Sequence, residues 1–179
     1  MNQIAIHILS LVQGLLLVTT GLATIYILVF AVAGLFYKQP PYPVAARFRK
    51  IAVLIPGYKE DEVIVEVARQ ALGQSYPANC FDVVIIADSF KPETLSRLRE
   101  MPVKVIEVSF EKSTKAKALN KAMEQLGDDY DIAVVLDADN VMAIDFLVKV
   151  NKAFEKEYQA VQGHRTAKNM NTSLALLDA

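Results

Sequence analysis

An uncharged apolar segment near the N-terminus constrains this chain more than any other feature. From Ile4 to Tyr37, 34 consecutive residues carry no formally charged side chain. As one helix this segment would be about 50 Å long, whereas the hydrocarbon core of a bilayer needs about 20 residues. Two crossings would need about 40 residues and a turn. The sequence therefore predicts one membrane-spanning helix and a transmembrane anchor over residues 1–38.

A cleaved signal peptide and a buried hairpin of a soluble protein are the alternatives to an anchor. A signal peptide has basic residues before a short apolar core, but the first basic residue here is Lys38. Charge-free runs beyond about 18 residues are typical of transmembrane helices and not of water-soluble domains. We therefore expect a retained anchor.

Charge is distributed unevenly between the two ends of the chain. The first 50 residues contain no Asp or Glu and four basic residues, Lys38, Arg47, Arg49 and Lys50, while the whole chain carries a net charge of -1. Basic residues flank the cytoplasmic side of a membrane helix. We expect a single-pass membrane protein whose C-terminal part is cytoplasmic, with a stiff proline-containing linker over residues 39–50.

The rest of the composition excludes several classes of partner. The part after residue 50 carries a net charge of -5, because the first 50 residues carry +4, and this argues against nucleic-acid binding. One cysteine, Cys80, and two histidines, His7 and His164, argue against a metal site built from cysteine or histidine.

From Ile51 onward, apolar runs typical of buried strands alternate with amphipathic helical patterns. The strand-like runs cover residues 51–55, 81–86, 103–108 and 131–136, with a weak fifth at 160–162. The helical stripes begin at Val63, Ala116 and Phe146. This alternation predicts an α/β domain over residues 51–179, with a mostly parallel sheet and helices on both faces.

Ligands of such sheets bind at the carboxyl ends of the strands. The residues that follow the predicted strands include an aromatic ring, carboxylates and lysines, a mixture that suits a base-plus-phosphate ligand with a divalent cation. The candidate binding residues are Pro56, Tyr58, Glu60, Asp88, Lys115, Asp137 and Asp139. Five of them also have a plainer interpretation: helix caps for the D-x-D pair, a turn for Asp88, packing for Tyr58 and a solvated lysine for Lys115.

Asp137 and Asp139 are the candidate metal ligands, because carboxylate oxygens suit Mg²⁺ or Mn²⁺. Other nucleotide-binding and hydrolase motifs are absent from the sequence. There is no G-x-G-x-x-G, no G-x-x-x-x-G-K-[ST] and no G-x-S-x-G.

Five segments, in order, resemble the family 2 glycosyltransferases of the GT-A fold. Ile55–Glu60 is similar to the family's I-P-x-Y-N-E opening, and Val83–Asp88 to its second strand. Lys115–Asn120 matches the K-A-x-A-L-N helix start, Val134–Asp139 the D-x-D strand, and Val161–Gly163 resembles the strand that follows. The anchor suits the cellulose- and hyaluronan-synthase-like members.

The resemblance implies roles for the matching positions. Tyr58 and Glu60 would lie by the nucleoside, and Pro56 would belong to the same nucleotide-sugar-binding set. Asp88 would contact the uracil edge, and Lys115 would lie near the nucleotide. Asp137 would approach the ribose, and Asp139 would hold the metal ion on the diphosphate. The expected reaction is a metal-dependent, inverting transfer from a nucleotide sugar, UDP-linked, to a glycan or lipid-linked acceptor, with Mg²⁺ or Mn²⁺ as cofactor.

The sequence also departs from the family pattern. Lys59 stands where Asn is common, Ala87 replaces an acid and Thr114 replaces a frequent Gly. The later acceptor-side Asp base and the Q-x-x-R-W motif are not found, and Asp178 lies in the helical pattern Leu174–Ala179. We therefore expect the donor-binding half of a longer enzyme. The alternative is a membrane-tethered non-catalytic nucleotide-sugar-binding or assembly module, and a nucleotidyltransferase ranks last because its glycine- and basic-rich loop is missing.

Overall fold

The chain consists of two separate units. The computed structural model describes residues 3–38, 41–156 and 158–164, and it divides into Met1–Pro41 and Tyr42–Ala179. The first unit is one helix, α1 (Gln3–Phe36). The hydroxyls of Thr19, Thr20 and Thr24 donate to carbonyl oxygens four residues earlier, at 2.9, 2.6 and 2.8 Å. The hydroxyls of these three threonines are thus satisfied within the helix.

By length and composition, α1 is a candidate membrane span. Its most apolar window has a mean hydropathy of 2.4, and it is the one helix of this kind among the residues that the structure describes. None of its residues is buried. Its orientation across a membrane and the domain limits 1–38, 39–50 and 51–179 stay predictions.

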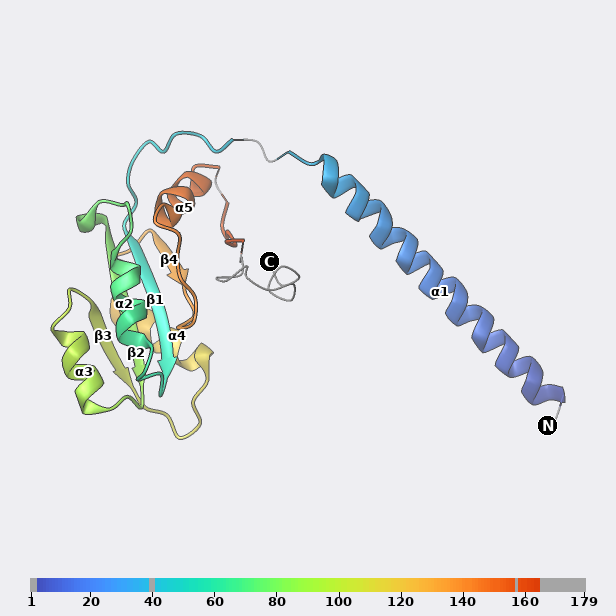
Figure 1. The fold of residues 1–179 in the computed structure, drawn as a ribbon, viewed down its shortest axis with the longest axis horizontal. Coiled ribbons are helices and arrows are strands. Elements are labelled where there is room, and N and C mark those ends of the chain that lie inside the picture. Colours follow the sequence, from blue (N-terminus) through green and yellow to red (C-terminus); the bar gives the residue numbers. More distant parts are fainter. Residues whose placement is uncertain (1–2, 39–40, 157, 165–179) are drawn as a thin grey trace. The chain divides into compact units, whose positions relative to one another are not determined.

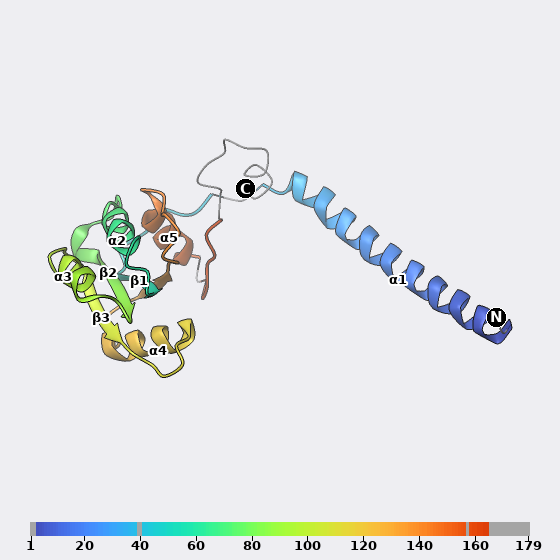
Figure 2. The ribbon, with the colours of Figure 1, turned by 60° about the horizontal axis from the view of Figure 1, so that its bottom comes forward.

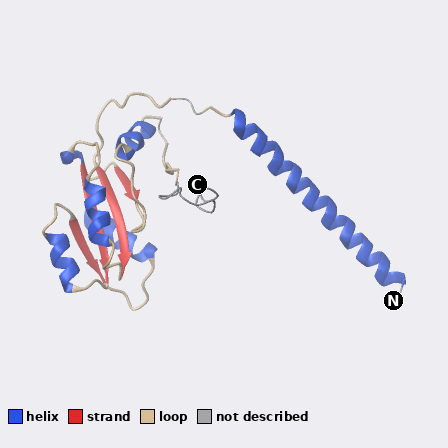
Figure 3. Cartoon of the chain, in the orientation of Figure 1, coloured by secondary structure: helices blue, strands red, loops and turns tan. Residues whose placement is uncertain are grey.

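The second unit contains a four-stranded parallel sheet (Figures 1 and 3). Its strands are β1 (Ile51–Tyr58), β2 (Phe81–Asp88), β3 (Lys104–Val108) and β4 (Ile132–Val135). The order across the sheet is β3-β2-β1-β4. The carboxyl ends of all four strands therefore meet at one edge. From β1 the chain adds β2 and β3 on one side and then β4 on the other side.

Helices cover both faces of this sheet (Figure 2). One face carries α2 (Ile64–Leu72), α3 (Pro92–Arg99) and α5 (Phe146–Phe154), and the other carries α4 (Lys115–Leu126). A short 3₁₀ turn, Ala78–Cys80, precedes β2. The predicted α/β architecture is confirmed.

The side chains of β1 alternate between two cores. Ile51, Val53 and Ile55 pack with the three-helix face, and Ala52 and Leu54 pack with α4. All five are at most 1% exposed. The continuous apolar run of β1 is thus explained by burial on both faces.

The structure differs from the sequence-based prediction in the weak fifth strand and at some element ends. Residues 158–164 form no strand, because Val161, 38% exposed, is the only large apolar side chain in the expected strand and pairing would bury little. The helix at α2 begins at Ile64, which is fully buried, while Val63 is 42% exposed. Asp178 and the pattern Leu174–Ala179 lie outside the described residues.

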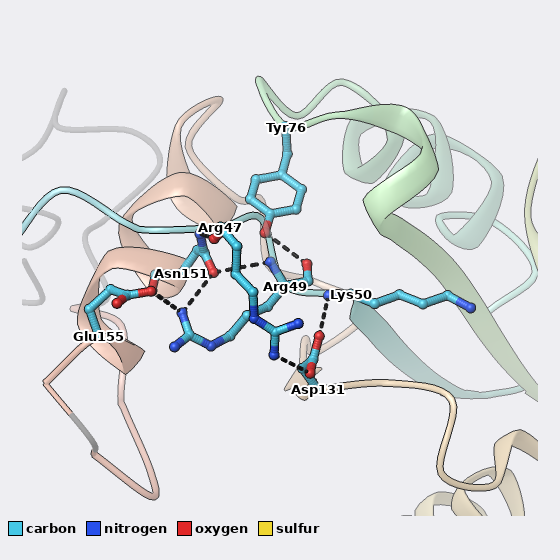
Figure 4. Close-up of polar contacts among 7 residues, drawn as sticks. All are labelled: Arg47, Arg49, Lys50, Tyr76, Asp131, Asn151 and Glu155. Carbon is cyan, nitrogen blue, oxygen red and sulfur yellow. Dashed lines mark hydrogen bonds and ion pairs between the residues drawn. The ribbon is translucent and has the colours of Figure 1, made fainter.

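The segment before β1 is fastened to the domain through α5 and Tyr76 (Figure 4). The buried amide of Asn151 donates to the Arg47 carbonyl oxygen at 2.8 Å and accepts from the Arg49 N–H at 3.3 Å. The Arg49 guanidinium pairs with Glu155 at 2.6 Å. The Tyr76 hydroxyl donates to the Arg49 carbonyl oxygen at 2.8 Å, and burial raises the pKa of Tyr76 to about 12. The start of β1 is therefore fixed from two sides.

Candidate functional site

A cleft of about 390 Å³ opens at the carboxyl ends of β1 and β2. It is lined by Pro56, Gly57, Tyr58, Glu60, Asp88, Ser113, Thr114, Lys115 and Ala118. Five of the seven residues expected from the sequence line it together, namely Pro56, Tyr58, Glu60, Asp88 and Lys115. The cleft thus lies where a parallel α/β sheet binds its ligands.

Two left-handed residues end the strands at this cleft. Tyr58 is paired with Asp88 in the sheet, and the Lys59 N–H donates to the Asp88 carbonyl oxygen at 3.1 Å. Directly afterwards, Lys59 has φ 55° and Ser89 has φ 59°. A non-glycine residue in this region is strained, and such strain gathers at functional sites. The two turns leave Tyr58 at the rim of the cleft, 53% exposed.

Asp88 is a buried carboxylate that lines the cleft without a cationic partner. It is 3% exposed, and its Oδ1 accepts a hydrogen bond from Ser89 Oγ at 2.9 Å. Within the described part of the chain, no Lys, Arg or His forms an ion pair with it. Because burying a carboxylate is costly without hydrogen bonds, its second oxygen is suited to accept an N–H from a ligand.

The N-terminus of α4 supplies positive charge to the same cleft. Thr114 is the N-cap of α4, and its hydroxyl accepts a hydrogen bond from the Lys117 N–H at 3.3 Å. The threonine that stands here in place of the family's frequent Gly therefore caps the helix. The helix N-terminus and the Lys115 ammonium together favour an anion. Lys117 itself donates to the Lys112 carbonyl oxygen at 3.0 Å and does not line the cleft.

The D-x-D pair lies in a turn directly after β4. The Leu136 N–H still donates to the Leu54 carbonyl oxygen at 2.9 Å, and the Asn140 N–H then closes a turn onto the Asp137 carbonyl oxygen at 3.0 Å. Ala138 is buried, Asp137 is half-exposed and Asp139 is exposed. The Lys115 ammonium pairs with Asp137 Oδ1, which connects this turn to the cleft. Asp139 does not line the cleft.

Asp137 and Asp139 can supply only some of the oxygen ligands that a Mg²⁺-type ion needs. The structure arranges no group of three or more His, Cys, Asp or Glu side chains around a metal position within residues 3–38, 41–156 and 158–164. Mg²⁺ in nucleotide sites is held by one or two carboxylates and by phosphate and water oxygens. The donor set of Asp137 and Asp139 therefore fits a cation that arrives with a diphosphate.

Gln74, just after α2, was not singled out in the sequence but contacts the loop between this turn and α5. Its Nε2 donates to the Ala143 carbonyl oxygen at 3.0 Å, and its Oε1 accepts from the Leu147 N–H at 3.2 Å. The Ser75 N–H donates to the Ile144 carbonyl oxygen at 2.7 Å. These contacts join positions about 70 residues apart, so no local motif could have indicated them.

A second pocket of about 430 Å³ adjoins the cleft and shares Glu60 with it. Its other lining residues are Lys59, Asp61, Glu62, Val63, Ser89 and Lys91. Hydrogen bonds from the Thr94 hydroxyl and the Lys91 N–H lower the pKa of Asp61. This carboxylate therefore holds the start of α3 against the turn after β1.

Comparisons with known proteins agree with this arrangement. A 119-residue segment is 31% identical to the glucans biosynthesis glucosyltransferase H of Rhodopseudomonas palustris strain TIE-1, covering 59% of this chain and 16% of that protein. This chain thus matches about one sixth of the length of that curated relative.

Two solved structures share the fold. The mannosyltransferase of Pyrobaculum calidifontis, in complex with GDP-mannose and Mn²⁺, superposes with a TM-score of 0.53 and 27% identity, over 65% of this chain and 36% of that one. Staphylococcus aureus TarS superposes with a TM-score of 0.52 and 18% identity, over 67% of this chain and 24% of that one. These neighbours confirm the predicted GT-A-like fold.

The match to a protein family extends over most of the soluble part. The sequence model of the family described as "Glycosyltransferase like family 2" matches residues 48–179, which include all four strands, the cleft and the D-x-D turn. The chain therefore belongs to the glycosyltransferase-like family 2.

Proposed function

We propose that this chain binds the nucleotide-sugar donor of a membrane-anchored glycosyltransferase. The observation that carries the proposal is the single cleft that brings Pro56, Tyr58, Glu60, Asp88 and Lys115 together. An aromatic ring and an acceptor carboxylate suit a nucleobase, and a helix N-terminus with a lysine suits a diphosphate.

We infer that the donor is UDP-linked. Asp88 Oδ1 is already bonded to Ser89, so one carboxylate oxygen is left for the base. Uracil offers one N–H donor, whereas guanine offers a ring N–H and an adjacent amino group that would engage both oxygens. The Pyrobaculum relative binds GDP-mannose, so GDP is the appropriate competitor in any binding test.

Divalent metal dependence is also part of the proposal. Asp137 and Asp139 would hold Mg²⁺ or Mn²⁺, supported by the Mn²⁺ bound to the Pyrobaculum relative. The metal would offset the negative charge that grows on the leaving diphosphate. Tyr58, Asp88 and Lys115 would bind and orient the nucleotide, and inverting transfer would go to a glycan or lipid-linked acceptor.

Calorimetry with the full chain in detergent tests this function. UDP is expected to bind in the presence of Mn²⁺ more tightly than GDP and much more weakly after chelation. Asp139→Ala should weaken metal-dependent UDP binding far more than Asp145→Ala, because Asp145 pairs with Lys149 at 2.8 Å on α5. UDP affinity that is equal with and without chelator would contradict the metal site. Absence of any nucleotide binding would favour a non-catalytic assembly module.

A further inference from the structure

We propose that Gln74 is a positioning residue for Asp137 and Asp139, because its side chain fixes the far end of the loop that carries them. The inference rests on the proposed function, which assigns a metal ion to these two carboxylates. Gln74 itself does not line the cleft and lies after α2.

The contacts of Gln74 hold both sides of the loop's end. Its side chain is nearly buried, with the residue 9% exposed. The Nε2 atom of its amide donates to the Ala143 carbonyl oxygen at 3.0 Å, and the Oε1 atom accepts from the Leu147 N–H at 3.2 Å. The neighbouring Ser75 N–H adds a main-chain bond to Ile144 at 2.7 Å. Three hydrogen bonds from two adjacent residues thus define where the loop meets α5.

Gln74 also replaces the missing cap of α5. The first N–H groups of a helix have no partner within the helix, and Asp145, the N-cap of α5, makes no capping hydrogen bond. Its carboxylate pairs with Lys149 instead. Gln74 Oε1 accepts from one of these first-turn groups, the Leu147 N–H. A residue that follows another helix, α2, therefore sets where α5 begins.

The loop from Asp137 to Asp145 is consequently held at its two ends. At one end the Leu136 N–H is bonded to β1 at 2.9 Å, and at the other end Gln74 holds Ala143 and Leu147. Without Gln74 the main-chain N–H of Leu147, a fully buried residue, would lose its side-chain acceptor, and an unpaired buried donor is costly. Without Gln74 we expect the loop to move, and displaced metal ligands lose affinity even when they remain present.

The test compares Gln74→Met with Asn151→Leu in the full chain in detergent. Asn151 is the matched control because it is also a buried amide bonded to main chain, but its partners are Arg47 and Arg49. Three quantities are measured. Electron paramagnetic resonance, with protein-free UDP samples as blanks, gives the Mn²⁺ affinity at saturating UDP. Calorimetry gives the UDP affinity in the presence of chelator. The third quantity is the hydrogen exchange of residues 137–147.

Gln74→Met is expected to weaken Mn²⁺ binding by about 10- to 100-fold, as for other residues that orient metal ligands. UDP affinity in chelator should stay within about twofold, since Gln74 does not line the cleft, and exchange should accelerate in residues 137–147. Asn151→Leu should change neither Mn²⁺ affinity nor exchange in that loop. Should Gln74→Met fail to fold, Gln74→Glu retains the acceptor for Leu147 and should weaken Mn²⁺ binding through loss of the donor to Ala143.

Two results would overturn the inference alone: unchanged Mn²⁺ affinity in the Gln74 variants, or equal losses in Asn151→Leu, which would indicate general destabilisation. A wild-type chain that binds UDP but no Mn²⁺ would overturn the metal part of the proposed function as well. A wild-type chain that binds neither would remove the proposed function, and the inference with it.

Discussion

The Lys115 ammonium, on the first residue of α4, pairs with the Asp137 carboxylate in the turn after β4. The two side chains are 50% and 42% exposed, and an exposed pair of this kind stabilises a fold by at most about 1 kcal/mol. Its importance is positional, because it joins the cationic end of the cleft to a candidate metal ligand. A bound cation would compete with Lys115 for Asp137.

Lys115→Met should therefore separate metal binding from nucleotide binding. Without nucleotide, Mn²⁺ affinity should rise several-fold because Asp137 loses a competing cation. UDP affinity should fall by about tenfold or more because a charge-assisted hydrogen bond is lost. Calorimetry measures both, and Lys117→Met is the control because Lys117 does not line the cleft. Weaker Mn²⁺ binding in the nucleotide-free variant would contradict the competition.

Asp88→Asn should weaken UDP binding by about 10- to 100-fold, the loss expected for a hydrogen bond to a charged acceptor. The amide can still accept from Ser89, so the fold should be preserved. Asp128→Asn, at an exposed position beyond α4, is the matched control. Equal UDP affinities in the two variants would show that Asp88 does not contact the base.

Lys59→Asn should relieve about 1 kcal/mol of backbone strain and stabilise the domain by about 0.5 kcal/mol net. Asn adopts the left-handed region more readily than Lys, and Lys59 has φ 55°. The gain is reduced by about 0.5 kcal/mol through loss of the cation–π contact, because Lys59 Nζ lies 5.1 Å from the Tyr58 ring centroid. Urea denaturation measures the change in the free energy of unfolding. Lys112→Asn, where φ is not positive, should leave it unchanged.

Stability should decrease in acid partly through Asp131. The Lys50 N–H, at 2.8 Å, and then the Arg47 guanidinium, at 2.9 Å, lower the pKa of Asp131 from its usual 3.8. A carboxylate with a lowered folded-state pKa stabilises the fold above its unfolded pKa, and this stabilisation is lost as the pH falls through the folded value. Urea denaturation between about pH 2 and pH 7 should show a shallower acid dependence for Asp131→Asn than for wild type. Parallel curves would contradict this role.

The orientation of α1 can be tested with a reporter fused after Lys50. All four basic residues of the first 50 follow the helix, so the positive-inside rule predicts a cytoplasmic reporter. Four lysines inserted before Gln3 remove this asymmetry and should reduce the cytoplasmic fraction. A wild-type reporter on the outer face of the membrane would contradict the predicted topology.

The positions of the strands could be predicted because each core strand is a run of apolar residues, but the end of β1 could not. Pro56 indicates a strand end at Ile55, yet β1 continues to Tyr58. The reason is that β4 pairs with β1 only as far as Leu54. Leu54 bonds toward β4 through its carbonyl oxygen, and the nitrogen of Pro56 faces the same side. No strand bond is lost there, so proline is tolerated.

The gathering of candidate residues at the cleft could be predicted in part, because it depends on where strands and helices end. Tyr58, Asp88 and Lys115 follow directly from strand and helix ends, which a parallel sheet gathers at one edge. The turn of Asp137 and Asp139 depends instead on Gln74, which is distant in sequence and carries no motif. The pairing of Lys115 with Asp137 is also a tertiary contact, across 22 residues.

The alternation along β1 couples the interior of the domain to its cleft. Ile51, Val53 and Ile55 occupy one face, while the α4 face is filled partly by Ala52, Ala118 and Ala122. A one-residue insertion in β1 would exchange the two faces and force isoleucine side chains against alanines. It would also move Tyr58 out of register with Asp88. Length changes within this strand should therefore abolish folding and ligand recognition together. Sequence changes in the surface loops, by contrast, can change folding or ligand recognition separately.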